Sequence, residues 1–209
     1  MDITTVFGTV VGGSNPSGGT IRPTKGSPEE SLFLCYDLDM SYIDEQQSVD
    51  YYNNRPGIRV GGGVLIFNEQ HQLLILKPNY RNTWLWPGGG WEPGESPQDV
   101  ALRECEEEIG IRLTHLEPAF VNYIPPRSDG SKDVIHFVYT TTPVNDGFFK
   151  TLVLQKSEIE DAMFVSIAEM DRYMKEYRVR ALNTYLKHRV AGAMLYLQDG
   201  LLSDASKTL

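Results

Sequence analysis

The sequence predicts a mixed α/β or α+β sandwich, and three observations lead to this expectation. Runs rich in Val, Ile, Leu and Phe occur both before and after one well-delimited helix. A segment rich in glycine and proline, residues 83–95, precedes that helix and is expected to be irregular. The C-terminal part carries two helical patterns, residues 167–177 and 180–197. Strands flanking a central helix, with helices closing the chain, are typical of such a sandwich. The expected strands are 58–67 and 72–78, joined as a hairpin, and then 119–124, 133–140 and 162–167.

Three parts follow one another along the chain. Residues 1–56 are expected to form an N-terminal arm, because their first half is rich in Gly, Ser, Thr and Pro. Within the arm, residues 32–43 are apolar enough to be an added strand or a segment exchanged in a homodimer. The main domain is expected at residues 57–170, with a helical extension of the same domain at 171–209.

Composition and charge narrow the class of partner. The formal net charge is -9, whereas proteins that bind long nucleic acids without specificity are usually basic. Hydrophobic residues make up 41% of the chain, and no apolar run approaches a membrane span. We therefore expect no long nucleic acid and no membrane as partners. The two cysteines form no disulfide or zinc pattern and the N-terminus has no basic start, so a cytoplasmic location is expected.

The helix expected at residues 97–109 carries an unusual acidic face. Ser96 is a favourable N-cap, Pro97 fits the first helical position, and Gly110 is a favourable stop. At about 100° per residue, Glu104, Glu107 and Glu108 share one arc beside the apolar stripe. An exposed acidic face would explain a bare run of glutamates. The glycine-rich loop before the helix instead favours a site for a hard cation, for which carboxylates are preferred ligands.

The segment Gly89 to Ile111 resembles the Nudix box of the Nudix (MutT-like) hydrolases. The pattern G-x5-E-x7-R-E-U-x-E-E-x-G-U, with U an apolar residue, is matched at every fixed position, with Cys105 at the first apolar one. The likeness extends over about residues 57–170. It implies an α/β/α sandwich with a mixed sheet and a C-terminal helix. It also implies Mg²⁺-dependent hydrolysis of a nucleoside diphosphate linked to another moiety, a small-molecule substrate.

The resemblance also implies roles for single residues. Glu104, Glu107 and Glu108 would bind Mg²⁺ or Mn²⁺, with Glu107 also catalytic, and Arg103 would orient Glu107. Glu95 would support the loop. A further acid from a downstream loop is expected as ligand or general base, with Glu158 preferred over its competitors Glu160 and Asp161.

Clues to the substrate are weaker. Pro126 lies fifteen residues past Ile111, as in the ADP-ribose pyrophosphatase branch, although a proline there also suits an ordinary turn. Trp84 and Trp91 could stack a base, or could simply pack under the loop. Lys77 and Arg81 could meet substrate phosphate, or could be ordinary surface cations.

ADP-ribose or a nucleotide sugar is therefore the first expectation. The alternatives are a (d)NTP pyrophosphatase, a prenyl-diphosphate phosphohydrolase and a non-catalytic nucleotide sensor. A sensor is disfavoured because every box glutamate is present.

Overall fold

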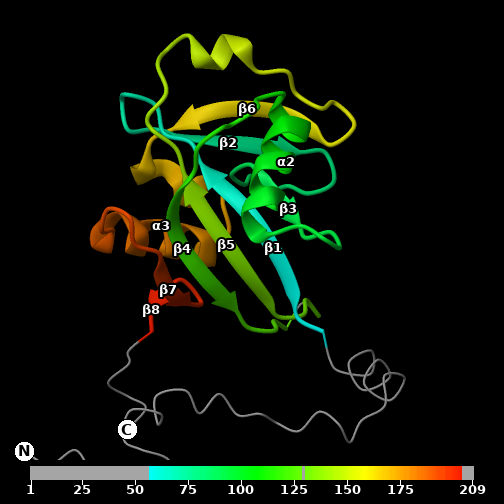
Figure 1. The fold of residues 1–209 in the computed structure, drawn as a ribbon, viewed down its shortest axis with the longest axis vertical. Coiled ribbons are helices and arrows are strands. Elements are labelled where there is room, and N and C mark those ends of the chain that lie inside the picture. Colours follow the sequence, from blue (N-terminus) through cyan, green and yellow to red (C-terminus); the bar gives the residue numbers. More distant parts are fainter. Residues whose placement is uncertain (1–56, 129, 204–209) are drawn as a thin grey trace, which may run out of the picture. The chain divides into compact units, whose positions relative to one another are not determined.

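The computed structural model describes residues 57–128 and 130–203, all within the unit Pro56–Leu209. The predicted N-terminal arm, including residues 32–43, lies outside the described residues. The described part contains a six-stranded mixed sheet, of order β3-β1-β5-β4-β7-β8, and a separate pair, β2 and β6 (Figure 1). The strands are β1 (Arg59–Leu65), β2 (Leu73–Pro78), β3 (Gly88–Gly90), β4 (Glu117–Ile124), β5 (Val134–Thr140), β6 (Ile159–Val165), β7 (Leu195–Gln198) and β8 (Leu201–Leu202). The helices are α2 (Pro97–Ile109), α3 (Glu176–His188) and two short 3₁₀ turns, η3 (Phe148–Thr151) and η4 (Ile167–Arg172).

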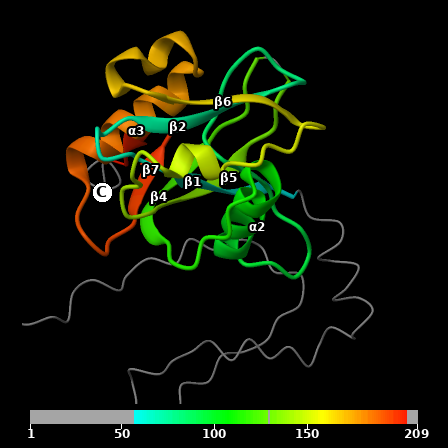
Figure 2. The same ribbon diagram turned by 90° about the horizontal axis from the view of Figure 1, so that it is seen from above.

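The helices α2 and α3 lie on opposite faces of the large sheet (Figure 2). Side chains of β1 alternate between the two faces, as a pleated strand requires. Val64 packs in the core that contains Ala101, Cys105 and Ile109 of α2. Leu65 packs in the core that contains Leu182 of α3. The predicted α/β/α sandwich with a mixed sheet is therefore confirmed.

The helix α2 spans the predicted residues 97–109. The Ser96 side chain accepts a hydrogen bond from the Asp99 amide, and the Asp99 side chain accepts one from the Ser96 amide, which completes a capping box. Gly110 ends the helix in the left-handed region, with φ of 72°. These local signals explain why the range could be predicted from sequence.

The C-terminal prediction was wrong in part. The pattern at 180–197 is not one helix, because α3 ends at His188 and residues 195–198 form strand β7 beside β4. The pattern at 167–177 is split between η4 and the first turn of α3. An apolar run such as "MLYL" satisfies a strand as well as a helix, and its pairing with β4 decides between them.

The glycine-rich segment was also not wholly irregular. Gly88–Gly90 forms a short strand that pairs with Gly61–Gly63 of β1. The predicted hairpin of the first two strands begins as expected, with Phe67 bridging Leu73, but β1 and β2 then enter different sheets.

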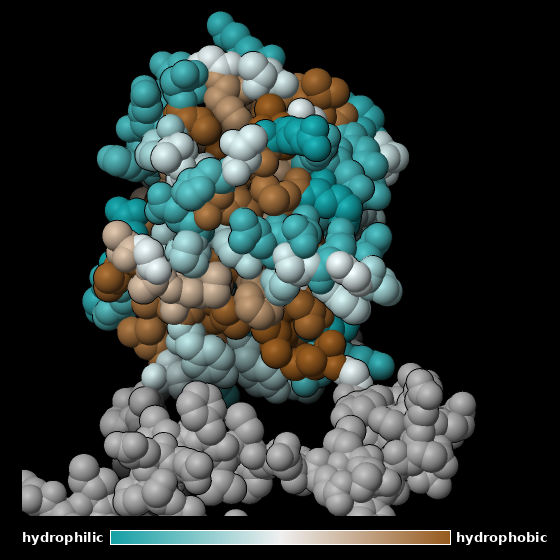
Figure 3. Space-filling model, viewed as in Figure 1, coloured by the Kyte–Doolittle hydropathy of each residue, from teal (hydrophilic) through white to brown (hydrophobic). Residues whose placement is uncertain are grey.

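None of the helices formed by residues 57–128 and 130–203 is long and apolar enough to cross a bilayer. On the face seen in Figure 3, apolar side chains form several separate groups among polar ones.

The close approach of α2 to β1 generates a first prediction. A Cβ atom on Gly62 would lie 2.6 Å from the Pro97 carbonyl oxygen and 3.0 Å from the Ala101 amide nitrogen. We expect Gly62→Ala to lower the unfolding free energy by about 1–3 kcal/mol, because backbone atoms cannot easily yield. Gly90→Ala is the matched control, since a Cβ there meets nothing within 4 Å. Chemical denaturation of both variants measures the difference, and equal losses would contradict this account.

The buried His136 generates a second prediction. Burial, and then the charge of Arg178, lower the pKa of His136 to about 3. The unfolded chain therefore takes up the proton first, near pH 6.5, so the stability present above that pH falls as the pH drops toward 3. This group should contribute a slope of about 1.4 kcal/mol per pH unit over that window. His136→Gln should flatten the slope of unfolding free energy against pH, and an unchanged slope would refute the assignment.

Candidate functional site

The acidic face of α2 is organised around one guanidinium group. Arg103 Nε donates to Glu95 at 2.6 Å, and its Nη1 donates to Glu104 at 2.8 Å and to Glu107 at 2.9 Å. Its Nη2 donates to the Gly90 carbonyl oxygen at 3.0 Å. Arg103 therefore connects the loop, the helix and strand β3, which fits the orienting role proposed for it.

The edge strand β3 presents its backbone to this face. In an antiparallel pair, alternate residues direct their amide and carbonyl groups away from the partner strand. Gly88 and Gly90 occupy such outward positions on β3, because the bonds from Val64 to Pro87 and from Trp91 to Val60 flank them. The Gly88 amide donates to Glu108 Oε2 at 2.9 Å, and the Gly90 carbonyl oxygen accepts from Arg103 Nη2. Side chains of α2 thus complete an edge that would otherwise lack partners.

Between these two glycines, Gly89 faces Glu104. A Cβ at this position would collide with the Glu104 carboxylate. Only glycine therefore allows the carboxylate to lie directly against the strand.

The carboxylates differ in burial, and their pKa values follow. Burial, opposed by the bond from Gly88, raises the pKa of Glu108 to about 8, and the charges of Glu104, Glu158 and Glu107 add to the rise. Burial also raises the pKa of Glu104 despite the adjacent Arg103. The side chain of Glu107 is half exposed. Glu106 points away and pairs with Arg112 at 3.8 Å.

This donor set suits a divalent cation. Within residues 57–128 and 130–203, no three acidic, His or Cys side chains already converge as a cage. Arg103 holds Glu104 and Glu107, and Gly88 holds Glu108. Burial nevertheless raises the pKa of both Glu104 and Glu108 by disfavouring their charged forms. A bound Mg²⁺ or Mn²⁺ would stabilise those charged forms, and carboxylate oxygens are its preferred ligands.

Glu158 lies near the same cluster. The segment before it is tied to α2, because the amides of Val153 and Gln155 donate to the carbonyl oxygens of Ile109 and Glu108. Its negative charge raises the pKa of both Glu104 and Glu108. Of its competitors, Glu160 lies 3.7 Å from Lys77. Asp161 accepts a hydrogen bond from the adjacent Ala162 amide.

The three predicted substrate contacts lie in different surroundings. Trp91 is 46% exposed in the glycine-rich loop before α2, and its Nε1 donates to the Glu95 carbonyl oxygen. Trp84 packs edge-on against Tyr173, with 5.9 Å between ring centroids, beside the α3 core. Pro126 lies exposed in the loop after β4. The binding roles of these three side chains stay predictions.

A cavity of about 390 Å³ adjoins β3, and six cationic side chains line it. Only Arg81 among them was considered from the sequence as a phosphate contact. The others come from distant segments and share no motif that sequence spacing could reveal. They are Arg59, Arg127, Lys132, Lys175 and Arg178.

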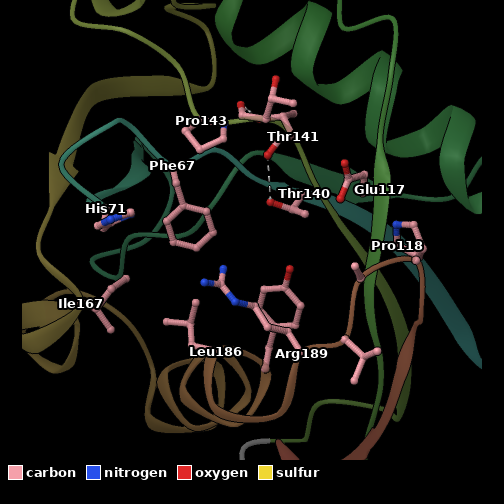
Figure 4. Close-up of a pocket in the computed structure, with 15 residues that line it drawn as sticks. Phe67, His71, Glu117, Pro118, Thr140, Thr141, Pro143, Ile167, Leu186 and Arg189 are labelled. Atoms are coloured by element: carbon pink, nitrogen blue, oxygen red, sulfur yellow. Dashed lines mark hydrogen bonds between the residues drawn. The ribbon is translucent and has the colours of Figure 1, made fainter.

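A second cavity of about 570 Å³ lies at the other end of the same strands (Figure 4). Phe67 and Thr140 line it, whereas Arg59 and Val134, at the opposite ends of β1 and β5, line the cavity near β3. Proximity to the glutamates therefore favours the smaller cavity as the substrate site.

Comparison with known proteins gives short sequence matches and broad fold matches. A stretch of 61 residues is 38% identical to the RNA pyrophosphohydrolase of Psychrobacter cryohalolentis, covering 29% of this chain and 35% of that protein. The enzyme of the same name from Ruthia magnifica subsp. Calyptogena magnifica is 38% identical over 60 residues, covering 29% of this chain and 34% of that protein. The chain thus spans about a third of the length of these relatives.

Solved structures extend the likeness in fold. The MutT NUDIX hydrolase of Burkholderia pseudomallei superposes with a TM-score of 0.50 at 19% identity, over 65% of this chain and 100% of that one. A NUDIX hydrolase of Nitrosomonas europaea gives 0.51 at 18% identity, over 63% and 90%. At this identity the likeness supports the fold alone.

The NUDIX domain itself matches residues 57–185, well over half of the chain. That range contains β3, all of α2 with its glutamates, Glu158 and most of α3. By this match, and by the geometry of the glutamates against the β3 edge, the chain belongs to the Nudix hydrolase family.

Proposed function

We propose that this protein is a metal-dependent pyrophosphohydrolase that cleaves a diphosphate bond in a nucleoside diphosphate linked to another group. The observation that carries the proposal is the partly buried carboxylate cluster beside β3, in which Arg103 holds Glu104 and Glu107 and the Gly88 amide holds Glu108. Family membership and the names of the short-matching relatives, which are RNA pyrophosphohydrolases, support the same reaction class.

In this proposal, Glu104, Glu107 and Glu108 would hold Mg²⁺ or Mn²⁺, which would supply positive charge to the diphosphate and lower the pKa of the attacking water. Arg103 keeps Glu107 oriented, and Glu95 fixes Arg103 from the loop. Glu158 lies close enough to act on the cluster electrostatically, which supports it as ligand or as acceptor of the proton of the water. Water adds to one phosphorus, the bridging P–O bond breaks, and the bridging oxygen leaves on the other phosphate.

The carboxylate cluster does not specify the group that is linked to the nucleoside diphosphate. ADP-ribose or a nucleotide sugar follows from Pro126, and an NTP or a prenyl diphosphate remains an alternative. Two of the relatives are named for action on RNA, whereas the net charge of -9 led us to expect no long nucleic acid. The cytoplasmic location and the homodimer stay predictions.

Neutralising single box carboxylates tests the catalytic assignment. Glu107→Gln and Glu108→Gln keep the side-chain shape but remove one negative charge, so kcat/KM should fall by on the order of 100-fold or more. Glu106→Gln is the matched control, because this side chain lies on the same helix but points to solvent and pairs with Arg112. Hydrolysis of a nucleotide diphosphate panel with Mg²⁺ measures the effect. Near wild-type turnover by Glu107→Gln or Glu108→Gln would remove that residue from the site.

Metal binding should also be visible in thermal stability. Mg²⁺ and Mn²⁺ should raise the melting temperature by a few degrees, because they bind the folded carboxylate cluster and not the unfolded chain. Glu104→Gln should shrink this shift, since Glu104 is among the least exposed donors, with 13% of its side chain accessible. Melting curves with and without millimolar metal provide the measurement. Curves indifferent to both metals would argue against a carboxylate metal site.

A further inference from the structure

The cavity beside β3 shares a wall with the glutamate cluster. Gly88, Gly89 and Gly90 line it, and the same strand is bonded on its outer edge to Glu108 and Arg103. A substrate phosphate held at the glutamates therefore lies one short strand away from this cavity. The remaining part of such a substrate can therefore reach this cavity across β3.

The charged side chains that line the cavity are all cationic. Among its described lining residues there are six cations and no Asp or Glu, in a chain whose net charge is -9. Arg81, Lys132 and Arg178 form no ion pair with any residue in 57–128 or 130–203. Three cations without an ion pair among these residues, gathered in one hollow of an acidic protein, favour a positive local potential. A positive potential favours the binding of a ligand with several negative charges.

Two of the guanidinium groups are held in place before any ligand arrives. The Arg127 guanidinium lies 4.3 Å from the ring centroid of Tyr177, and its Nη2 donates to Asp199 at 2.6 Å. The Arg178 guanidinium lies 4.9 Å from the ring centroid of Trp86. Because stacking fixes these planar groups, little side-chain freedom is lost when they bind an anion.

Arg127 also has an unused donor. Its Nε atom is buried and has no hydrogen-bond partner among the described residues. A buried donor without an acceptor is costly, and an anionic oxygen would satisfy it.

The C-terminal hairpin holds Arg127 in this position. Asp199, in the turn between β7 and β8, accepts bonds from both Arg127 and Arg180. Its amide bonds to the Tyr123 carbonyl oxygen, and the next residue, Gly200, bonds to Asn122. The predicted extension at 171–209 therefore contributes directly to the cavity.

Phosphate matches this lining better than a neutral sugar does. The hydroxyl groups of ribose or a hexose both donate and accept hydrogen bonds, and carboxylates or side-chain amides commonly accept from them. The described lining residues include no Asp, Glu, Asn or Gln. Phosphate oxygens instead match Arg and Lys donors directly.

We infer that this cavity binds the phosphate groups of the substrate that extend beyond the cleaved bond. The substrate is then a nucleotide with a chain of three or more phosphates, not a diphosphate joined to a neutral sugar. The inference rests on the proposed function and specifies the group linked to the nucleoside diphosphate. Water adds to one phosphorus of the chain and the bridging P–O bond breaks, so the products together equal the substrate plus one water. Both a free nucleotide and the 5′-triphosphate end of an RNA present this chemistry.

Steady-state hydrolysis tests the inference with ATP, ADP-ribose and a short 5′-triphosphorylated oligoribonucleotide, all with Mg²⁺. We expect kcat/KM to be at least about tenfold higher for ATP or the oligoribonucleotide than for ADP-ribose. The better of these two identifies the source of the phosphate chain. Arg81→Gln combined with Lys132→Gln should lower kcat/KM for the preferred substrate by about tenfold or more, and for ADP-ribose by less. Lys187→Gln, an exposed cation of α3 outside the cavity, is the matched control.

A binding measurement separates this inference from the proposed function. Calorimetry with inorganic tripolyphosphate, in the presence of a chelator, probes the cavity without metal or catalysis. Binding that weakens at least about tenfold in the Arg81→Gln/Lys132→Gln variant supports the cavity, even if no substrate is hydrolysed and the proposed function fails. Hydrolysis that favours ADP-ribose, together with tripolyphosphate binding equal in variant and wild type, overturns the inference while the pyrophosphohydrolase stands.

Discussion

Two glycine runs, paired across β1 and β3, are the constraint on which the rest of the site depends. Gly61–Gly63 lies against Gly88–Gly90, and the missing side chains leave room on both faces of the sheet. On one face, Gly62 and Gly89 let α2 and the Glu104 carboxylate approach the backbone. On the other face, Gly63 allows the indole of Trp86 to lie where a Cβ would come within 2.8 Å of its Nε1. Larger residues in these two runs would push α2 and the Trp86 indole away from the sheet. A close-packed interior has no space for the added side chains.

Charge is then distributed very unevenly across this small region. Four carboxylates share the single guanidinium of Arg103 or rely on backbone amides, which leaves the cluster short of positive charge. Across β3, six cations line one cavity. An acidic protein can therefore bind an anionic substrate, because a local potential, and not the net charge, acts at short range when salt screens distant charges. The negative net charge of the chain therefore does not by itself exclude anionic ligands.

Elements far from α2 in the sequence also shape the cavity beside β3. The turn between β7 and β8 joins Arg127 to Arg180 through Asp199, and Arg178 of α3 stacks over Trp86. Trp86, not Trp84, is the tryptophan beneath the cavity, since it stacks on His136 with 6.2 Å between centroids. The C-terminal segment therefore does more than cover the core. It carries part of the wall of the cavity beside β3.

The sequence by itself determined the helix 97–109, its caps, its acidic face, the family and the sandwich class. These features depend on neighbouring residues: a capping box acts over three positions, and helical periodicity places three glutamates on one arc. Only the tertiary structure decided the parallel pairing of β1 with β5, the strand at 195–198 and the strand within the glycine-rich loop. It alone brought together Arg59, Arg81, Arg127, Lys132 and Arg178, and gave Trp84 and Trp86 different surroundings. The physical reason is range: strand pairing and charge convergence join residues far apart in the chain, and no local propensity encodes which of them will meet.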